Sequence, residues 1–202
     1  GRMPPSLEKI IKLKPSLVIG SEGFHDKILD KLGDLNIETL KTNTKSINQL
    51  EILIKDLAFY LNKNPSSVND NIKSCYLNKS KDRGSAVILA STKPLLSPNS
   101  NSWAGKLLDR FNFDNISKDL ESKTEFKGYV NLSPEIILKK KPSKIIVISF
   151  PGMNQNSLLV NPIFQKIIDS NKNAIITFNY YGLINPGSLK TINSACKKLS
   201  NI

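Results

Sequence analysis

The sequence predicts an α/β fold in which two lobes with mostly parallel sheets are joined by a single long linking helix. Three observations lead to this prediction. The stretch SLEKIIKLKPSLVI, which begins at Ser6, returns without a gap as SPEIILKKKPSKII, which begins at Ser133. Helical and β-branched stretches alternate along the chain, as they do around a parallel sheet that is covered on both faces. One helical stretch, 65–83, separates the two lobes, 1–64 and 84–202.

Each copy of the repeat predicts a helix that leads into a strand. In both copies a Ser at the N-cap, a Glu in the first turn and a Pro that ends the helix precede a β-branched run. The first helix ends before Pro15 and its strand covers 17–20; the second helix ends at Lys141 and its strand covers 145–149. A long-range repeat of this kind indicates two copies of one supersecondary unit.

The rest of the first lobe continues the alternation. A helix that ends near Leu32 and is closed by Gly33, followed by a short strand at 36–40, completes a strand, helix, strand unit. Ser46 then begins a helix with a capping box, SINQ, and an apolar face that extends to about Asn62.

The linking helix begins where Asn64 is followed by Pro65, a favourable cap and first-turn pair. Its apolar side carries Val68, Ile72 and Cys75. About seventeen residues at 1.5 Å each give roughly 25 Å, which is long enough to cross from one lobe to the other.

The second lobe again alternates strands and helices. Besides the second copy of the repeat, the predicted segments are a strand at 85–90, a Pro/Ser/Asn-rich loop at 91–102, a helix from 103 to about 111, a helix at 162–169, a strand at 174–178, a loop at 179–187 and a terminal helix. This order predicts a mostly parallel sheet with helices on both faces.

Composition indicates an ordinary globular protein. The chain has 202 residues and 39% hydrophobic content, and no apolar run approaches the ~20 residues that span a bilayer. The net charge is +12, but only three of the 29 basic residues are Arg, the residue that dominates direct base readout. We therefore expect no nucleic-acid partner.

The two cysteines, Cys75 and Cys196, provide no zinc site, because neither belongs to a CxxC motif or stands near the single histidine, His25. They could pair in an oxidising compartment, whereas the helical position predicted for Cys75 favours simple packing. The sequence leaves both possibilities open.

Several stretches together resemble the helical-backbone substrate-binding proteins of ABC importers, the group that serves cobalamin, ferric siderophores and haem. The matching elements are PSLEKIIKLKPSLVIG, the linking helix, WAGKLLDRFNFDNIS, NLSPEIILKKKPSKIIVIS and IITFNYYGLINPGSLKTINSACKKL. Members of this family normally carry an additional strand and helix before the first copy of the repeat, together with an export signal. The first lobe is therefore expected to be incomplete in this sequence.

The resemblance implies a non-catalytic, extracytoplasmic protein that binds a solute and delivers it to an ABC permease. The implied solute is an iron chelate or a corrinoid or haem-type compound, so a metal belongs to the ligand and no cofactor belongs to the protein. The expected partners are the permease and this small ligand. Contact with the membrane is expected only through the permease or a preceding anchor.

The repeat places Glu8 and Glu135 at equivalent positions, one in each lobe. The residues alone allow a simple role, since a carboxylate in the first turn of a capped helix interacts favourably with the helix dipole. The resemblance implies a second role, in which the two glutamates stand on the lobe tips and dock onto arginines of the permease.

Ligand contacts are expected on the loops at the carboxyl ends of the strands, where open α/β sheets leave a crevice. An aromatic rim there suits a flat macrocycle or a catecholate, although each aromatic side chain could instead belong to the core. The candidate ligand-binding residues are Phe24, His25, Trp103, Phe150, Met153, Tyr180 and Tyr181.

The alternative to a binding protein is an α/β enzyme that binds a nucleotide or a phosphorylated substrate at the loop 20–23, GSEG. This loop follows a predicted strand and precedes a predicted helix, as phosphate-binding loops do. It lacks the GxGxxG pattern and carries an acid, Glu22, where phosphate would approach. His25 is the one possible imidazole base, and no GxSxG motif presents a serine.

Overall fold

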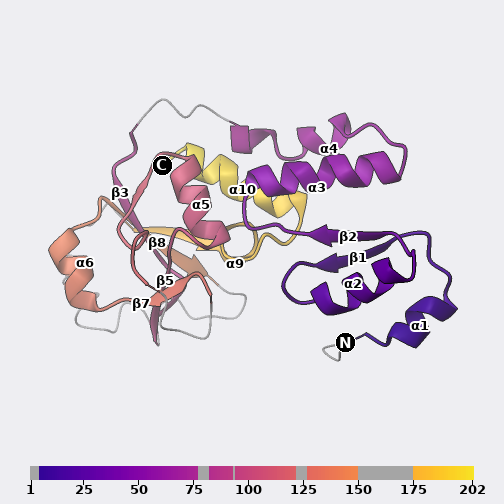
Figure 1. Ribbon diagram of the computed structural model, residues 1–202. Coiled ribbons are helices and arrows are strands. Elements are labelled where there is room, and N and C mark those ends of the chain that lie inside the picture. Colours follow the sequence, from indigo (N-terminus) through magenta and orange to yellow (C-terminus); the bar gives the residue numbers. More distant parts are fainter. Residues whose placement is uncertain (1–4, 77–81, 93, 122–126, 150–174) are drawn as a thin grey trace. The chain divides into compact units, whose positions relative to one another are not determined.

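The structure is a computed structural model that describes residues 5–76, 82–92, 94–121, 127–149 and 175–202 (Figure 1). These residues form two compact units, Gly1–Thr44 and Lys45–Ile202. The helix α3, Ile47–Tyr60, therefore groups with the second unit, whereas the sequence analysis placed it in the first lobe. The mixed α/β class and the mostly parallel sheets are confirmed.

The first unit is a small parallel α/β motif. Its elements are α1 (Leu7–Lys12), β1 (Val18–Ser21), α2 (Asp26–Asp34) and β2 (Thr39–Thr42), and β1 pairs with β2 in parallel. Leu29 and Leu32 of α2 are fully buried. A Cβ atom at Gly20 would lie 2.8 Å from the Leu29 side chain, so the absence of a side chain at Gly20 lets α2 pack closely on β1.

The described residues of the second unit form two sheets. The four-stranded sheet is entirely parallel in the order β6-β3-β8-β9, and the three-stranded sheet is antiparallel in the order β4-β5-β7. The strands are β3 (Ser85–Leu89), β4 (Ser91–Thr92), β5 (Leu95–Pro98), β6 (Asp114–Asn115), β7 (Tyr129–Asn131), β8 (Lys144–Ser149) and β9 (Ile175–Asn179). Among the described residues, the helices after α3 are α4 (Ser66–Asp70), the 3-10 helix η1 (Lys73–Tyr76), α5 (Trp103–Arg110), α6 (Pro134–Lys140), α9 (Tyr180–Leu183) and α10 (Leu189–Ser200).

Both faces of the parallel sheet are buried. Along β3, Ala86 and Ile88 belong to a core shared with α3, η1, α5 and α10, while Val87 and Leu89 belong to a second core that includes Ile137 of α6. Successive side chains of a strand point to opposite faces, so this alternation places helices on both sides of the sheet. The sequence analysis predicted this arrangement.

The repeat is visible in the backbone. Each copy folds as a short helix followed by a parallel strand, α1 with β1 and α6 with β8. Lys14 and Lys141 hold the same place in the two copies, and both adopt a left-handed conformation, with φ of 46° and 44°. Each stands directly before a proline, whose ring disfavours the right-handed helical conformation of the preceding residue. The same helix ending therefore recurs in both units.

The prediction of one continuous linking helix over 65–83 is wrong within its described part. Helix α4 ends at Asp70, and the chain continues through the 3-10 turn η1; residues 77–81 lie outside the described ranges. Ser, Asn and Asp are frequent here, and their side chains compete for backbone hydrogen bonds. The buried Ile72 and Cys75 are three residues apart, and the Cys75 amide donates to the Ile72 carbonyl at 2.9 Å, which suits a 3-10 turn.

Several further boundaries differ from the prediction, among them those of α2 and of the loop 91–102. Helix α2 continues past Gly33 to Asp34, and the left-handed residue after it is Asn36, with φ of 60°. The stretch predicted as the loop 91–102 contains β4 and β5, because β5 pairs with β7, a partner about thirty residues away that local sequence does not reveal.

Candidate functional site

An aromatic loop follows directly after β9, at the carboxyl end of that strand. It consists of Tyr180, Tyr181 and Gly182, the first residues of α9, where the backbone angles of Tyr181 and Gly182 are not helical. A hydrogen bond from the Trp103 indole nitrogen to the Gly182 carbonyl oxygen, 2.9 Å long, ties this loop to the start of α5. Ser102 caps α5 by accepting a hydrogen bond from the Gly105 amide at 3.0 Å. The cap fixes where α5 begins and hence where the indole lies.

Gly182 allows the loop to pack against α10. Its φ is 95°, and a Cβ atom at this position would lie 2.2 Å from the Thr191 carbonyl oxygen. Both the positive φ and the close approach of the Thr191 carbonyl exclude a side chain at this position. Thr191 also closes the capping box of α10 with Ser188, so the helix end and the aromatic loop stabilise each other.

The side chains of Trp103 and Tyr181 differ in how far they are exposed to solvent. Trp103 is 6% exposed and belongs to the core, whereas Tyr181 is 55% exposed. The rings of Tyr180 and Tyr181 pack edge to face, with centroids 5.3 Å apart. Trp103 therefore supports the loop from the inside, and Tyr181 presents its ring to solvent.

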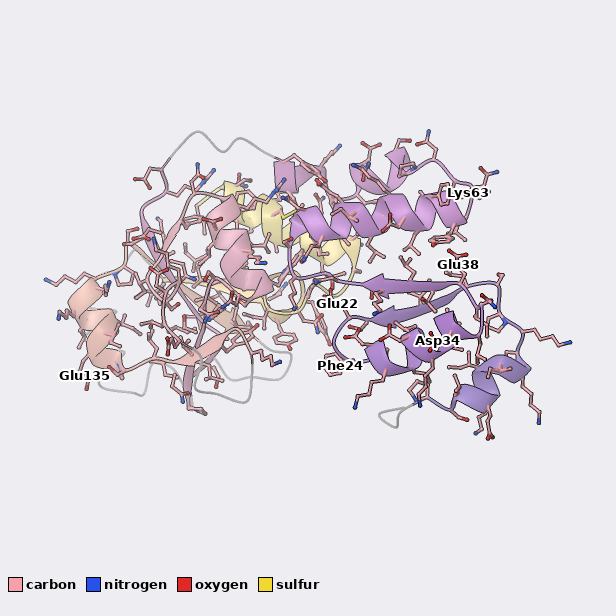
Figure 2. All side chains as sticks on the ribbon, viewed as in Figure 1. Glu22, Phe24, Asp34, Glu38, Lys63 and Glu135 are labelled. Carbon is pink, nitrogen blue, oxygen red and sulfur yellow. A yellow bond between two sulfur atoms is a disulfide. The ribbon has the colours of Figure 1, made fainter. Side chains whose placement is uncertain are left out.

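The other predicted ligand residues lie elsewhere. Phe24 and His25 belong to the first unit, where Phe24 is 88% exposed (Figure 2). His25 accepts a hydrogen bond from the Ser21 amide on its Nδ1 atom at 2.9 Å, which leaves Nε2 for any external contact. Phe150 and Met153 lie outside the described residues. The structure thus brings together Trp103, Tyr180 and Tyr181 within one unit, as well as Phe24 and His25 within the other.

The loop 20–23 offers no free amides to a phosphate. The amides of Ser21, Glu22, Gly23, Phe24 and His25 all donate to acceptors within the first unit, at 2.9 to 3.2 Å. The acceptor of the Gly23 amide is the carboxylate of Asp26, at 3.0 Å. Phosphate-binding helix starts depend on unpaired amides that point at the ligand, so this loop is poorly suited to the task.

The two repeated glutamates are exposed in the first turns of α1 and α6. Figure 2 shows Glu135 on α6. Hydrogen bonds from the Ser133 hydroxyl and from its own backbone amide lower the pKa of the Glu135 carboxyl group. In the first copy the Ser6 hydroxyl instead accepts a hydrogen bond from the Lys9 amide at 3.4 Å. These hydrogen bonds favour the charged form of Glu135.

Replacing Ser133 with Ala is expected to raise the pKa of Glu135 toward the ordinary value. A hydrogen bond donated to a carboxylate favours its charged form, so loss of the hydroxyl makes protonation easier. The measurement is a pH titration of the Glu135 carboxyl carbon by NMR. The control is Ser143→Ala, because the Ser143 hydroxyl donates to the Ser85 carbonyl oxygen at 2.7 Å and not to Glu135. An unchanged midpoint in Ser133→Ala would contradict the assignment.

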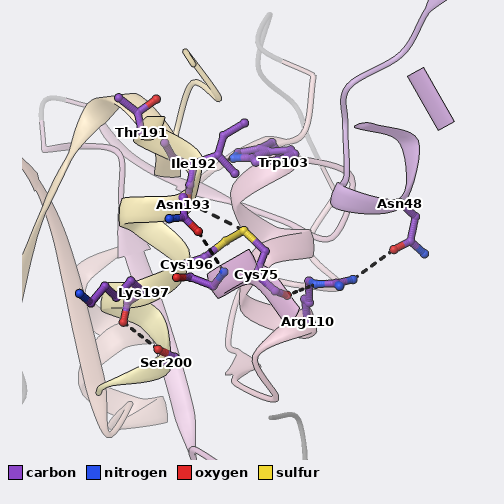
Figure 3. Close-up of a disulfide and its surroundings, with 12 residues drawn as sticks. Asn48, Cys75, Trp103, Arg110, Thr191, Ile192, Asn193, Cys196, Lys197 and Ser200 are labelled. Carbon is purple, nitrogen blue, oxygen red and sulfur yellow. Dashed lines mark hydrogen bonds between the residues drawn. A yellow bond between two sulfur atoms is a disulfide. The ribbon is translucent and has the colours of Figure 1, made fainter. Parts of the chain in front are cut away.

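A disulfide joins Cys75 of η1 to Cys196 of α10, with a Cα–Cα distance of 4.9 Å (Figure 3). The question that the sequence left open is therefore answered in favour of pairing. The Ser74 amide donates to the Asn193 side chain at 2.9 Å beside it, and Arg110 donates to the Cys75 carbonyl oxygen at 2.7 Å. Together these contacts fix η1 against α10 and α5.

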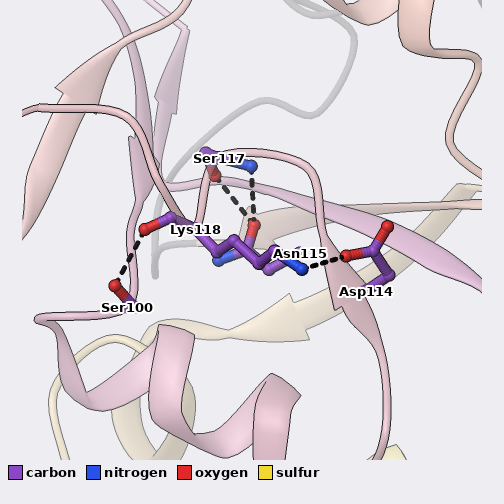
Figure 4. Close-up of polar contacts among 5 residues, drawn as sticks. All are labelled: Ser100, Asp114, Asn115, Ser117 and Lys118. Carbon is purple, nitrogen blue, oxygen red and sulfur yellow. Dashed lines mark hydrogen bonds and ion pairs between the residues drawn. The ribbon is translucent and has the colours of Figure 1, made fainter.

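Two pockets that the sequence analysis did not anticipate lie around residues 114–119. The larger, of about 670 Å³, lies between α5 and β6, and the smaller, of about 480 Å³, lies between β6 and α6. At both pockets the Lys118 ammonium group forms an ion pair with the Asp114 carboxylate, with an N–O distance of 2.9 Å (Figure 4). The side-chain oxygen of Asn115 accepts hydrogen bonds from the amide and the hydroxyl of Ser117. Within the described ranges, no three His, Cys, Asp or Glu side chains are grouped as metal ligands would be, and no helix is long and apolar enough to cross a membrane.

The comparisons with known proteins agree with this architecture. The family model of the periplasmic binding proteins matches residues 1–176, so the chain belongs to the periplasmic binding protein family. No curated protein sequence matches the chain.

Solved structures with a similar fold come from several bacteria. The periplasmic vitamin B12 binding protein BtuF of Vibrio cholerae has a TM-score of 0.68 at 18% identity, covering 96% of this chain and 76% of BtuF. A possible iron-binding, periplasmic solute-binding protein of Staphylococcus epidermidis has a TM-score of 0.65 at 19% identity, with coverages of 97% and 79%. The periplasmic heme-binding protein RhuT from Roseiflexus sp. has a TM-score of 0.61 at 16% identity, with coverages of 97% and 80%. At these identities the similarity shows a common fold, that of two-lobed periplasmic binding proteins.

Proposed function

We propose that this chain is a non-catalytic solute-binding protein that captures an iron chelate, a corrinoid or haem outside the cytoplasm and presents it to an ABC permease. The observation that carries the proposal is the aromatic loop at the carboxyl end of β9, in a chain of the periplasmic binding protein family. The proteins of similar fold include ones named for vitamin B12, iron and heme.

The chemistry of the aromatic loop suits a flat, conjugated ligand. The exposed ring of Tyr181 offers apolar area and a phenol group, and its edge-to-face contact with Tyr180 limits how far it can move. A preordered aromatic surface loses little conformational entropy when a planar ligand stacks on it. On the first unit, Phe24 and His25 supply a second exposed aromatic group beside an imidazole nitrogen.

Glu8 and Glu135 are the proposed contacts with the permease. They are exposed, they occupy the same place in the two copies of the repeat, and each opens a short helix. Exposed charges of this kind mainly steer and align an encounter. The pair of copies provides one such charge in each unit.

The disulfide supports a location outside the cytoplasm. Cys75 and Cys196 are both buried, and structural disulfides persist in oxidising compartments such as the bacterial periplasm. The proposal that the protein is not an enzyme is supported by the loop 20–23, whose amides already have acceptors.

The test is a fluorescence titration, because Trp103 is the one tryptophan of the chain and supports the aromatic loop. We expect one of three probes, a ferric catecholate siderophore, haemin or cyanocobalamin, to quench this fluorescence saturably. Replacing Tyr181 with Ala is expected to weaken that binding by about tenfold, since a good aromatic contact contributes on the order of 1 kcal/mol beyond the area it buries.

The control variant is Phe59→Ala, which removes another exposed aromatic ring, on α3, and is expected to leave the affinity unchanged. Quenching by nucleotides alone would favour the enzyme alternative. Equal affinities of the wild type and the Tyr181→Ala variant would remove the aromatic loop from the ligand site.

A further inference from the structure

Both copies of the repeat contain a lysine four residues after the shared glutamate. Lys12 follows Glu8 by four residues, and Lys139 follows Glu135 by the same interval. Where one copy has a lysine outside these shared positions, the other has an apolar residue: the three mismatched pairs are Lys9 with Ile136, Leu13 with Lys140, and Leu17 with Lys144. The remaining shared lysines, Lys14 and Lys141, form the left-handed helix ends described above.

On α6 the acid and the base lie on the solvent face of the helix. Ile137 is 1% exposed and anchors α6 in the core, whereas Glu135 and Lys139 are both exposed. Residues four apart lie on the same face of a helix, one turn from each other, and Ile137 lies on the opposite side. In α1 the equivalent residues, Glu8 and Lys12, are exposed as well.

Neither lysine has a partner among the described residues. A Glu followed by a Lys four positions later is the favourable arrangement for an ion pair within a helix. Neither copy forms it, and Glu135 instead accepts a hydrogen bond from Ser133. A role in stabilising the helix end would also be filled by Lys140, which immediately follows Lys139. In α6 this role therefore does not by itself require a lysine at position 139, whereas in α1 Lys12 lies in the last turn and is followed by Leu13.

The smaller pocket gives a partner room beside Lys139. Lys139 and Lys140 line one side of this pocket, whose volume is about 480 Å³. Lys118 lines the other side, where it forms an ion pair with Asp114. Asp119 also lines the pocket, and the side formed by α6 carries the two lysines that have no ion pair among the described residues. A carboxylate side chain of an approaching protein fits this charge and this space.

We propose that Lys139 is a second docking residue that pairs with a carboxylate of the permease, one helical turn away from the base that Glu135 contacts. Lys12 has the same role in the other unit, one helical turn away from the base that Glu8 contacts. The inference rests on the proposed function, which supplies the permease as partner. A single glutamate would pair with any exposed base. An acid and a base in fixed order along a helix also set the direction in which the two proteins meet, because the reversed alignment places like charges together.

The test is ATP hydrolysis by the organism's ABC permease in proteoliposomes, titrated with the full chain. We expect Lys139→Glu to raise the half-stimulating concentration by at least tenfold, Lys139→Arg to keep it within about threefold, and Lys55→Glu to leave it unchanged. Lys55 is exposed on α3, outside the repeat, so it controls for the change in net charge. Trp103 fluorescence with the quenching probe verifies that ligand binding is unaltered in each variant.

The outcomes separate this inference from the proposed function. If the wild type stimulates the permease, Glu135→Lys does not, and Lys139→Glu behaves as the wild type, the inference on lysine is overturned while the proposed function stands. If the wild type fails to stimulate at all, the proposed function fails, and this inference with it. Binding of the wild type but not of Lys139→Glu to permease-free vesicles of phosphatidylglycerol and phosphatidylcholine would assign the lysine to lipid and overturn the inference.

Discussion

Replacing Cys75 and Cys196 together with Ala is expected to lower the free energy of unfolding by about 3–5 kcal/mol. The two residues are separated by 121 positions, so the disulfide closes a long loop and removes much conformational entropy from the unfolded chain. For a loop on the order of 100 residues the chain-entropy model gives about 4.7 kcal/mol. Because most domains are stable by only about 5–15 kcal/mol, such a loss is a large fraction of the total.

The measurement is urea unfolding of the wild type and the double variant, each with and without dithiothreitol. We expect the reductant to lower the wild-type midpoint to that of the variant and to leave the variant unchanged. A wild type that is indifferent to reduction would show that the disulfide does not form in solution.

The loss of the disulfide is also expected to affect the aromatic loop. Cys196 lies on α10, and the same helix supplies the Thr191 carbonyl against which Gly182 packs. Cys75 in turn lies on η1, next to the amide that donates to Asn193 of α10. The bond therefore fixes the helix on which the loop rests, and we expect the reduced protein to bind the quenching ligand more weakly.

Glu135→Lys is expected to reduce permease-stimulated ATP hydrolysis below a tenth of the wild-type rate, and Glu8→Lys is expected to do the same. Each change replaces a charge that attracts a permease base with one that repels it, and like charges at an interface cost several kcal/mol. Ligand affinity is expected to stay unchanged, because both residues lie in the first turns of α1 and α6 and not on the aromatic loop.

The control for this prediction is Glu121→Lys, which makes the same charge change at an exposed residue of the second unit outside the repeat. Trp103 fluorescence reports ligand binding in each variant, and ATP hydrolysis reports docking. Normal stimulation by Glu135→Lys would remove the glutamates from the permease interface.

Local sequence was sufficient wherever an element depends on its own residues. Ser6 and Ser46 each cap a helix as predicted, because the cap needs only a hydroxyl and an amide two or three residues away. The apolar face predicted for α3 is confirmed at Ile47, Leu50 and Ile54, which are buried, because one face of a helix is read directly from its period. It is wrong at its end, where Leu61 is 65% exposed.

Local sequence failed where distant segments decide the outcome. Apolar residues at 68, 72 and 75 fit a helix, but the pairing of Cys75 with Cys196 and the hydrogen bond of Ser74 to Asn193 belong to a 3-10 turn held by α10. The candidate site shows the same limit. Trp103 was a candidate ligand contact by type, and only its burial and its bond to Gly182 reveal a supporting role.

By itself the sequence determined the α/β class, the repeat and the equivalence of Glu8 and Glu135, because these follow from order and spacing along one chain. The tertiary structure decided which aromatic rings face solvent, that the cysteines pair, and that the amides of the loop 20–23 are occupied. Exposure, cross-links and hydrogen-bond partners depend on residues that approach one another only when the chain folds, and no local pattern specifies them.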